Sequence, residues 1–299
     1  MRVHFLPPIV RSIALEPVEH SLTKCAPPDI SIVKDALDAD LIVVPIIGRR
    51  DKIRQLTSVF RQRKQRYVIA QYVLRSSQKP NTNEWIDIWQ QAHFVWSYYN
   101  LPLLCAEDRC PYDFRFYRSP LGGDDDVFQT VPLSHDRPAL ILSSGRAWTD
   151  ESARECVLAA QQVGKIAWHL GASFPPLMRS DIPTLRVWPK VSDDELVRIY
   201  QQVQYVSGLR RVEGFELPSV EGLLCGARPI MFDRPHYRDW FGPLAEYIPE
   251  GTREQELADL VRLFESPYRP VTIGEVNQAR LLFDWGPIAE GFWSRCLHD

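Results

Sequence analysis

The sequence predicts an α/β protein built from two Rossmann-like domains, and three observations favour this fold. Short runs of β-branched and aromatic residues alternate with segments of helical period, which is typical of parallel sheets with crossover helices. A turn-rich stretch at 118–126 interrupts this alternation, and the pattern restarts at Ala139. The chain has 299 residues, enough for two compact domains of about 150 residues each.

Composition excludes several other classes of protein. Hydrophobic residues make up 45% and charged residues 24% of the chain, which excludes a disordered, collagen-like or coiled-coil protein. No apolar stretch approaches the roughly 18 residues of a membrane span, and prolines interrupt the apolar amino terminus too early for a signal peptide. The six cysteines lack CxxC or zinc-binding spacing. We therefore expect a cytoplasmic protein with reduced thiols and no metal site.

The first half is expected to supply four strands with helices between them. The strand candidates are apolar and rich in β-branched or aromatic residues: Val3–Leu6, Leu41–Ile46, Val68–Val73 and Phe94–Tyr98. The helix candidates are Ile32–Ala39, Lys52–Arg66 and Asn83–Gln91.

The second half repeats the alternation. Its strand candidates are Ala139–Ser144, Ile166–Leu170, Leu185–Val187, a short run at Tyr205–Val206, and Pro229–Phe232. Its helix candidates are Asp150–Val163, Asp193–Gln201 and Pro218–Cys225. Because open parallel sheets bind ligands at the carboxyl ends of their strands, the loops after the first, second and fourth of these strands are expected to carry function.

The segment 210–230 predicts a loop, a short helix and a strand. Pro218 suits the first helical position, where its missing N–H costs nothing, and we place Glu221 in the first turn, where the helix dipole favours an anion. Gly226 stands where a left-handed cap would end the helix. A carboxylate there can accept two hydrogen bonds from a vicinal diol such as ribose, and the amides of the helix start can bind phosphate.

The same segment carries a family resemblance. From Glu213 it runs E-G-F-E-L-P-S-V-E-G-L-L-C-G-A-R-P-I, which resembles the E-G-F-G-L-P-x-x-E-A-M-A-C-G-x-P-V-I signature, with its E-x7-E spacing, of retaining GT-B glycosyltransferases of the glycogen-synthase and family-4 type. Weaker matches follow the family's order over about 120–299: 120–128, Ser144-Gly145-Arg146, 187–196 and 283–289.

The resemblance implies a GT-B fold, in which two Rossmann-like domains face a central cleft. Residues 1–130 would form the acceptor-side domain, 131–280 the donor domain, and 281–299 a helix that crosses back to the first domain. The implied activity is transfer of a sugar, with retention, from a nucleotide sugar to an acceptor hydroxyl. No metal or other cofactor is implied, and UDP and GDP are the expected donor nucleotides.

The resemblance also implies site roles. Glu213 would be the catalytic residue against the donor sugar and leaving phosphate, and Glu221 would bind the ribose hydroxyls. The remaining donor-binding residues would be Gly145 and Arg146 at the diphosphate, the backbone amides of Gly214, Phe215, Glu216 and Leu217, and Lys190 and Val191, with Val191 against the base.

Two departures from the family pattern bear on the donor. The family has a lysine five residues after the first-loop arginine, and Glu151 occupies that position here. An acid cannot stabilise a departing diphosphate, so Lys190, Arg210 and Arg211 are the candidates to replace that lysine. The segment 233–239 stands in place of the family's glycine-rich sugar loop, which leaves the donor sugar open.

A basic segment lies in the first half. Between Arg49 and Arg66 there are eight basic residues and one acidic residue, a net charge of +7 in a chain whose total is −3. Arg50, Arg54 and Arg61 share one helical stripe. One interpretation is a solvated helix face; the other is docking of an anionic acceptor or surface. The sequence leaves the acceptor open among glycan, lipid-linked and nucleic-acid molecules.

Two other functions remain open at this point. A nucleotide-sugar epimerase could use the same fold, although the segment from Glu213 does not resemble that of the 2-epimerases. A binding or scaffold protein could keep the fold without catalysis, and Glu151 is the residue that favours this alternative.

Overall fold

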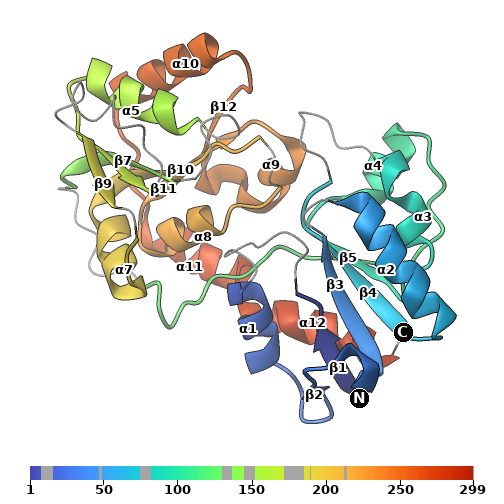
Figure 1. The fold of residues 1–299 in the computed structure, drawn as a ribbon. Helices are drawn as coiled ribbons and strands as arrows, with labels where there is room; N and C mark the ends of the chain where they lie inside the picture. Colours follow the sequence, from blue (N-terminus) through green and yellow to red (C-terminus); the bar gives the residue numbers. More distant parts are fainter. Residues whose placement is uncertain are drawn as a thin grey trace. The chain divides into compact units, whose positions relative to one another are not determined.

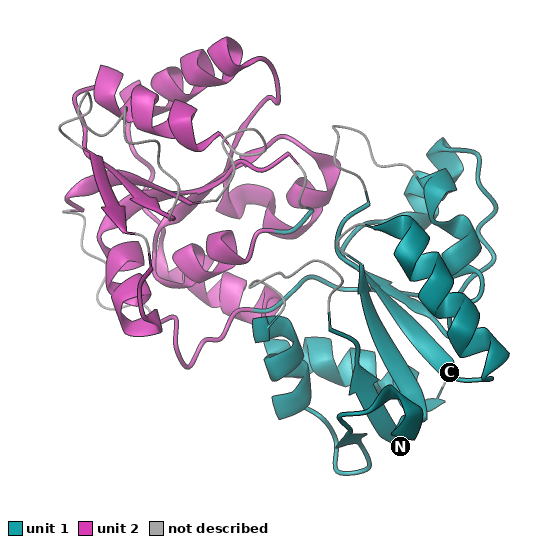
Figure 2. Ribbon diagram, viewed as in Figure 1, with its two compact units in different colours: residues 1–122, 212–215, 284–299 teal, residues 123–211, 216–283 magenta. Residues whose placement is uncertain are grey.

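The computed structural model describes most of the chain. The described residues are 1–7, 16–46, 49–74, 82–129, 137–144, 152–171, 185–188, 190–211 and 214–298. The chain divides into two compact units (Figure 2). Unit 1 comprises 1–122, 212–215 and 284–299, and unit 2 comprises 123–211 and 216–283.

Unit 1 contains a parallel sheet of order β2-β1-β3-β4-β5-β6 within the described residues. Its strands are β1 (Arg2–Phe5), β2 (Ser31–Ile32), β3 (Leu41–Ile46), β4 (Arg66–Gln71), β5 (Val95–Ser97) and β6 (Phe116–Arg118). The central strands β3 and β4 are almost wholly buried, as expected for a parallel sheet covered on both faces.

Helices cover both faces of this sheet (Figure 1). They are α1 (Glu16–Lys24), α2 (Arg50–Gln62), α3 (Ile86–Trp89), α4 (Leu101–Glu107) and α12 (Trp285–His298), with 3₁₀ turns η2 (Ala36–Asp38) and η3 (Thr82–Glu84). Helices α1 and α12 pack side by side. The Phe292 ring of α12 lies 5.8 Å from that of Phe94 and 5.0 Å from that of Trp96, so the carboxyl-terminal helix completes the core of unit 1.

Unit 2 contains a second parallel sheet, of order β12-β11-β10-β7-β8-β9 within the described residues. Its strands are β7 (Ala139–Ser144), β8 (Ala167–Leu170), β9 (Leu185–Trp188), β10 (Val203–Gly208), β11 (Arg228–Phe232) and β12 (Glu246–Ile248). The first strand of the unit is central, and later strands are added on either side of it.

Two groups of helices enclose this sheet (Figure 1). The pair α5 (Ala153–Gln162) and α10 (Arg253–Glu265) packs together on one face, and α8 (Leu217–Leu224) packs with α7 and α11 on the other. Helix α7 spans Asp193–Gln201 and α11 spans Ile273–Leu282, while α9 (Pro235–Phe241) and η4 (Gly242–Leu244) connect β11 to β12.

The predicted elements were correct for most strands and wrong for two helices. The structure has β2 and the 3₁₀ turn η2 in place of a helix over Ile32–Ala39. The Asp35 carboxylate there accepts a hydrogen bond from the Leu37 amide at 2.8 Å, which favours a turn over a helix. The predicted helix Asn83–Gln91 is divided into η3 and the short α3.

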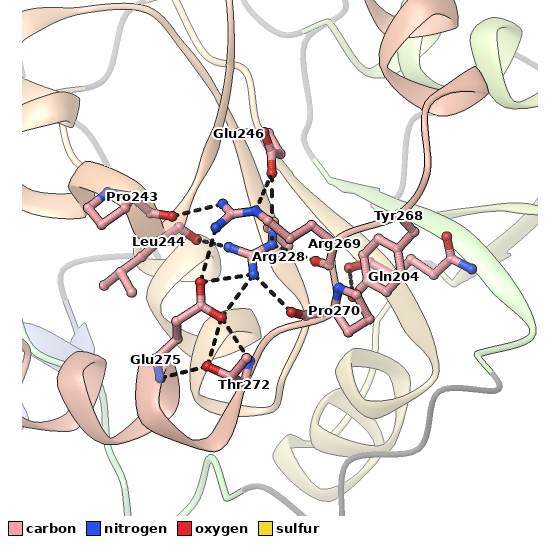
Figure 3. Close-up of polar contacts among 10 residues, drawn as sticks. All are labelled: Gln204, Arg228, Pro243, Leu244, Glu246, Tyr268, Arg269, Pro270, Thr272 and Glu275. Atoms are coloured by element: carbon pink, nitrogen blue, oxygen red, sulfur yellow. Dashed lines mark hydrogen bonds and ion pairs between the residues drawn. The ribbon is translucent and has the colours of Figure 1, made fainter.

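A buried arginine joins three elements of unit 2 (Figure 3). The Arg228 side chain, at the start of β11, has no exposed surface. Its guanidinium donates to both carboxylate oxygens of Glu275 at 3.0 Å and to the carbonyls of Leu244, Arg269 and Pro270. A buried charge needs such partners, and this one fixes the first turn of α11 against β11 and η4.

Candidate functional site

The topology of unit 2 places a switch point between β7 and β10. From β7 the chain adds β8 and β9 on one side and β10, β11 and β12 on the other, so the strand order reverses between these two neighbours. Ligands of open α/β sheets bind at the carboxyl ends of strands at such a switch point. Strand β7 ends at Ser144 and β10 ends at Gly208.

Arg210 lies at this switch point. Its guanidinium donates to the Ser144 hydroxyl at 2.9 Å, and its Nε lies 3.3 Å from a carboxylate oxygen of Glu216. The Arg210 side chain is 15% exposed and that of Glu216 is fully buried. The Tyr237 hydroxyl donates weakly to the other Glu216 oxygen at 3.4 Å. Arg210 is therefore a cation held in place at the carboxyl edge of the sheet and still open to solvent.

Helix α8 starts beside this arginine. Pro218 is the second residue of α8, one position later than predicted, because the helix begins at Leu217. The backbone of Gly226 has a φ of 82°, which confirms the predicted left-handed cap. The Ser219 hydroxyl is buried and has no hydrogen-bond partner among the described residues. A Cβ at Gly208 would come within 2.6 Å of that hydroxyl, so β10 and the start of α8 approach closely only because residue 208 is glycine.

Glu221 belongs to the second turn of α8, and its predicted place in the first turn was wrong because the helix begins at Leu217. The carboxylate is half-buried, and the Tyr200 hydroxyl of α7 donates to its Oε2 at 2.9 Å. Burial raises the pKa of Glu221 to about 7, and the negative charge of Asp193 adds to that rise, while the Tyr200 bond and the charge of Arg210 lower it. The hydrogen bond leaves oxygen lone pairs able to accept from a ligand hydroxyl.

The neighbouring Arg211 is enclosed by carboxylates. Its guanidinium forms an ion pair with the buried Glu256 and lies 3.8 Å from Glu250, and it donates to the Ser152 hydroxyl at 3.1 Å. Arg234 binds the same Glu250 at 2.7 Å. The charge of Arg211 is thus neutralised by the carboxylates around it.

The other predicted donor residues are distributed as follows. Lys190 is exposed and Val191 half-buried, directly before the Ser192 cap of α7. Leu217 is half-buried at the start of α8. Glu213, Arg146 and Gly145 lie outside the described residues, as does Glu151.

Gly214 and Phe215 are grouped with unit 1. The Phe215 ring lies 5.5 Å from that of Tyr98, and a Cβ at Gly214 would collide with the Tyr99 hydroxyl. Glycine at 214 is therefore required by close packing, whatever its role towards a ligand.

The predicted basic stripe is divided between two environments in unit 1. Arg50 and Arg54 both pair with Asp87 of α3, at 3.3 and 2.6 Å. Thr57, between them and Arg61, is buried. Arg61 lies about 16 Å along the helix from Arg50, is exposed and shares no carboxylate with them. The three arginines do not form one uniform solvated face.

Sequence reasoning missed three members of this site: Ser144, Ser219 and Tyr200. The serines end a strand and begin a helix, positions where hydroxyls often face ligands, so their placement was a usable signal. No sequence signal joins Tyr200 to Glu221, because α7 and α8 meet only in the folded unit.

The described part of the chain contains no group of three or more His, Cys, Asp or Glu side chains that could hold a metal ion. Within those same residues no helix has the length and apolar character needed to cross a membrane.

Comparison with known proteins decides the fold. No protein-family model matches the chain, and no curated protein sequence matches it. Its structure, however, resembles that of Anabaena HepE in complex with UDP and glucose, with a TM-score of 0.74, 11% identity and all of both chains covered. The protein has a GT-B fold.

Two more solved structures agree. A glycosyltransferase from Rickettsia africae matches with a TM-score of 0.70 and 9% identity, over 100% of this chain and 98% of that one. Sucrose-phosphate synthase from Thermosynechococcus elongatus matches with a TM-score of 0.66 and 16% identity, over 87% of this chain and 74% of that one. At these identities the likeness establishes the architecture, and function has to be argued from the site.

Proposed function

We propose that the protein is a retaining glycosyltransferase that moves a sugar from a nucleoside diphosphate to an acceptor hydroxyl. The observation that carries the proposal is that unit 2 contains both a half-buried carboxylate and a positioned cation. The carboxylate is Glu221, bonded by Tyr200, and the cation is Arg210 at the switch point. A carboxylate suits a ribose diol, and a cation beside a helix start suits a diphosphate. The resemblance of the segment from Glu213 to family-4 enzymes supports the same ligand.

Arg210 is proposed to supply the positive charge that the family's lysine would give and that Glu151 cannot. Its ion pair with Glu216 is specific to this chain, because the family signature has glycine where Glu216 stands. Arg146 and Lys190 would add further positive charge, with Val191 against the base and the amides of 214–217 along the sugar and diphosphate. Glu213 would face the donor sugar.

In the proposed reaction the bond between the anomeric carbon and the diphosphate oxygen breaks, and the acceptor oxygen bonds to that carbon on the same face. The acceptor proton passes to the departing phosphate oxygen, so no separate base is required. Positive charge at the diphosphate stabilises the leaving group. Retention and independence from metal are tested by the anomeric coupling of the product in proton NMR and by activity in the presence of EDTA.

The two units are proposed to bind different substrates. Unit 2 is proposed to bind the donor and unit 1 the acceptor, with the basic segment of unit 1 contacting an anionic acceptor or surface. The neighbour from Anabaena was solved with UDP, and UDP and GDP remain our expected donor nucleotides. A cytoplasmic location stays a prediction from the cysteines.

A panel of UDP, GDP, ADP, TDP and CMP, measured by thermal shift, tests the donor site. Wild type is compared with Glu221→Ala and with Glu265→Ala, an exposed glutamate of unit 2 used as a matched control. A nucleotide at 100 times its dissociation constant should stabilise the wild type by about 2.7 kcal/mol. We expect one diphosphate to shift the wild type and the control, and Glu221→Ala to lose most of that shift.

If nucleotides stabilise the Glu221→Ala variant as much as wild type, Glu221 does not contact the ribose and this part of the proposal is wrong. Once the nucleotide is known, incubation with its sugar derivatives separates the functions. A glycosyltransferase consumes the donor only with a hydroxyl acceptor, apart from slow hydrolysis. An epimerase converts the donor without any acceptor, and a binding protein leaves it intact.

A further inference from the structure

Unit 1 contains a second candidate site, remote in the chain from the residues proposed to bind the donor. A hollow of about 300 Å³ opens between the end of α2, the start of β4 and the residues before β5. Its polar lining comprises Arg61, Lys64, Gln65, Arg66, Gln91 and His93. It lies at the amino ends of β4 and β5, the opposite edge of the sheet from the carboxyl ends where α/β proteins bind their main ligand.

The charge of this hollow is positive and unneutralised. Arg61, Lys64 and Arg66 are exposed and form no ion pair with any carboxylate of the described residues. Arg50 and Arg54, on the same helix as Arg61, show the contrast because both pair with Asp87. Three like charges around one hollow repel one another, and an anion bound between them would relieve that repulsion.

Two side chains at the rim are held in place by neighbours. The Arg66 guanidinium donates to the His93 ring and to the Cys296 carbonyl at 3.5 Å. The Gln65 amide donates to the Ala36 carbonyl at 2.7 Å, which fixes its orientation. Its Oε1 is then a buried acceptor without a hydrogen-bond partner in the described residues. A ligand that brings a hydroxyl as well as an anionic group would satisfy that oxygen.

The backbone at Lys64 decides which variant tests this charge best. Lys64 follows the cap of α2 and has a φ of 55°, the left-handed conformation for which glycine is preferred at a helix end. A lysine is strained there, although its charge is favourable at the negative end of the helix dipole. Replacement of Lys64 by glycine therefore removes the charge and relieves backbone strain.

We propose that this hollow binds the phosphate group of a hydroxylated phosphate ester. Arg61, Lys64 and Arg66 would contact the phosphate oxygens, and Gln65 would accept a hydrogen bond from an ester hydroxyl. The same chemistry is present in a soluble glycerol or sugar phosphate and in the headgroup of an anionic phospholipid. The experiment therefore has one arm for each source.

In the soluble arm, glycerol 3-phosphate and inorganic phosphate are titrated by calorimetry into the full chain. Arg61→Gln and Lys64→Gly are each expected to weaken glycerol 3-phosphate binding by about tenfold or more, the usual loss for a charge-assisted hydrogen bond. Lys64→Gly also removes strain, so its melting temperature should match or exceed that of wild type, and lost binding cannot be attributed to unfolding. Lys34→Gln, which removes an exposed charge of unit 1 outside the basic segment, is the matched control and should bind normally.

In the lipid arm, sedimentation is measured with phosphatidylglycerol vesicles and with phosphatidylcholine vesicles. Binding that depends on Arg61 and Lys64 in either arm supports the site. The arm in which it occurs shows whether the ligand is a soluble phosphate ester or a phospholipid headgroup. The proposal is overturned if neither glycerol 3-phosphate nor phosphatidylglycerol binds, or if Lys34→Gln weakens binding as much as Arg61→Gln. Nucleotide thermal shifts in the same variants keep this result separate from the donor site.

Discussion

At the scale of single residues, the candidate donor site depends on two carboxylates in different environments. Glu221 is half-buried beside a neutral phenol, and its pKa is raised to about 7 by burial. Glu216 is fully buried but lies against the guanidinium of Arg210. The first is suited to bind a diol once it is ionised, and the second is suited to hold a cation.

The raised pKa of Glu221 predicts a pH-dependent contribution to stability. The folded protein holds the proton between about pH 4.5 and 7, where the unfolded chain has lost it, so the free energy of unfolding falls as pH rises through this range. Glu221→Gln should remove this component. Urea unfolding gives the free energy of unfolding of wild type and of Glu221→Gln. The difference between these two free energies should change by at most about 3 kcal/mol between pH 5 and 8. A difference that stays constant over this range would contradict the raised pKa.

Substitution of Arg210 separates its two proposed roles. Arg210→Met leaves Glu216 as a buried carboxylate without its cation, which should cost about 3 kcal/mol or more of unfolding free energy. Adding Glu216→Gln should recover most of that stability, because the uncompensated charge is gone. Nucleoside diphosphate affinity should remain low in the double variant. Recovery of affinity together with stability would show that Arg210 only supports the fold.

At the scale of elements, buried arginines join helices and strands that are distant in the sequence. The Arg137 guanidinium donates to the carbonyls of Tyr200, Val203 and Cys225, which ties the ends of α7 and α8 to the start of β10. These are the two helices that carry Tyr200 and Glu221. The positions of Tyr200 and of Glu221, the carboxylate proposed to bind ribose, are therefore set partly by an arginine at the carboxyl ends of both helices.

The network around Arg228 should be among the most sensitive in unit 2. Arg228→Met removes the buried cation beside Glu275, which keeps the exposed Arg269, and leaves three carbonyls without this donor (Figure 3). The expected loss is about 3 kcal/mol or more of unfolding free energy. Arg262→Ala is the control, because Arg262 is 74% exposed and paired with its helical neighbour Asp259; such pairs contribute less than about 1 kcal/mol. If both variants lose the same free energy of unfolding in urea, the buried Arg228 network does not contribute more stability than an exposed ion pair.

At the scale of the whole molecule, the chain leaves unit 1 after Gly122, contributes 212–215 to it, and returns to it at Asp284. The returning helix α12 contributes Phe292 and Trp293, both buried, and the Trp293 indole donates to the Leu22 carbonyl at 3.0 Å. The core of unit 1 is thus completed by α12, whereas the strands and helices of unit 2 all lie between Gly123 and Phe283.

Truncation after Phe283 should therefore affect the two units unequally. Unit 1 would lose α12 and expose the apolar face around Phe94 and Trp96, while unit 2 keeps all of its strands. Hydrogen exchange should show β3 and β4 losing protection and β7 and β10 retaining it. Phe292→Ala, a milder change expected to cost about 3 to 5 kcal/mol, should weaken the same strands; equal loss of protection in both units would contradict this division.

Much of the secondary structure could be predicted from local pattern. The bounds predicted for β3, β7 and α7 are those observed, because continuous apolar runs and a Ser192–Glu195 capping box are complete within a few residues. The helices α10 and α11 were not predicted, although Thr252 and Thr272 open capping boxes of the same kind. The false helix at Ile32–Ala39 arose because a short apolar run has no decisive period.

The sequence by itself determined the two α/β halves, the loop-helix-strand segment at 210–230 and the presence of Glu221 and Arg210, since each depends on residues close together in the chain. Only the tertiary structure decided the partners of those residues. Tyr200 donates a hydrogen bond to Glu221. Arg210 contacts Ser144 and Glu216. Arg211 forms an ion pair with Glu256. Such pairings depend on how strands and helices pack, and burial, which sets the pKa of Glu221, exists only once they have packed.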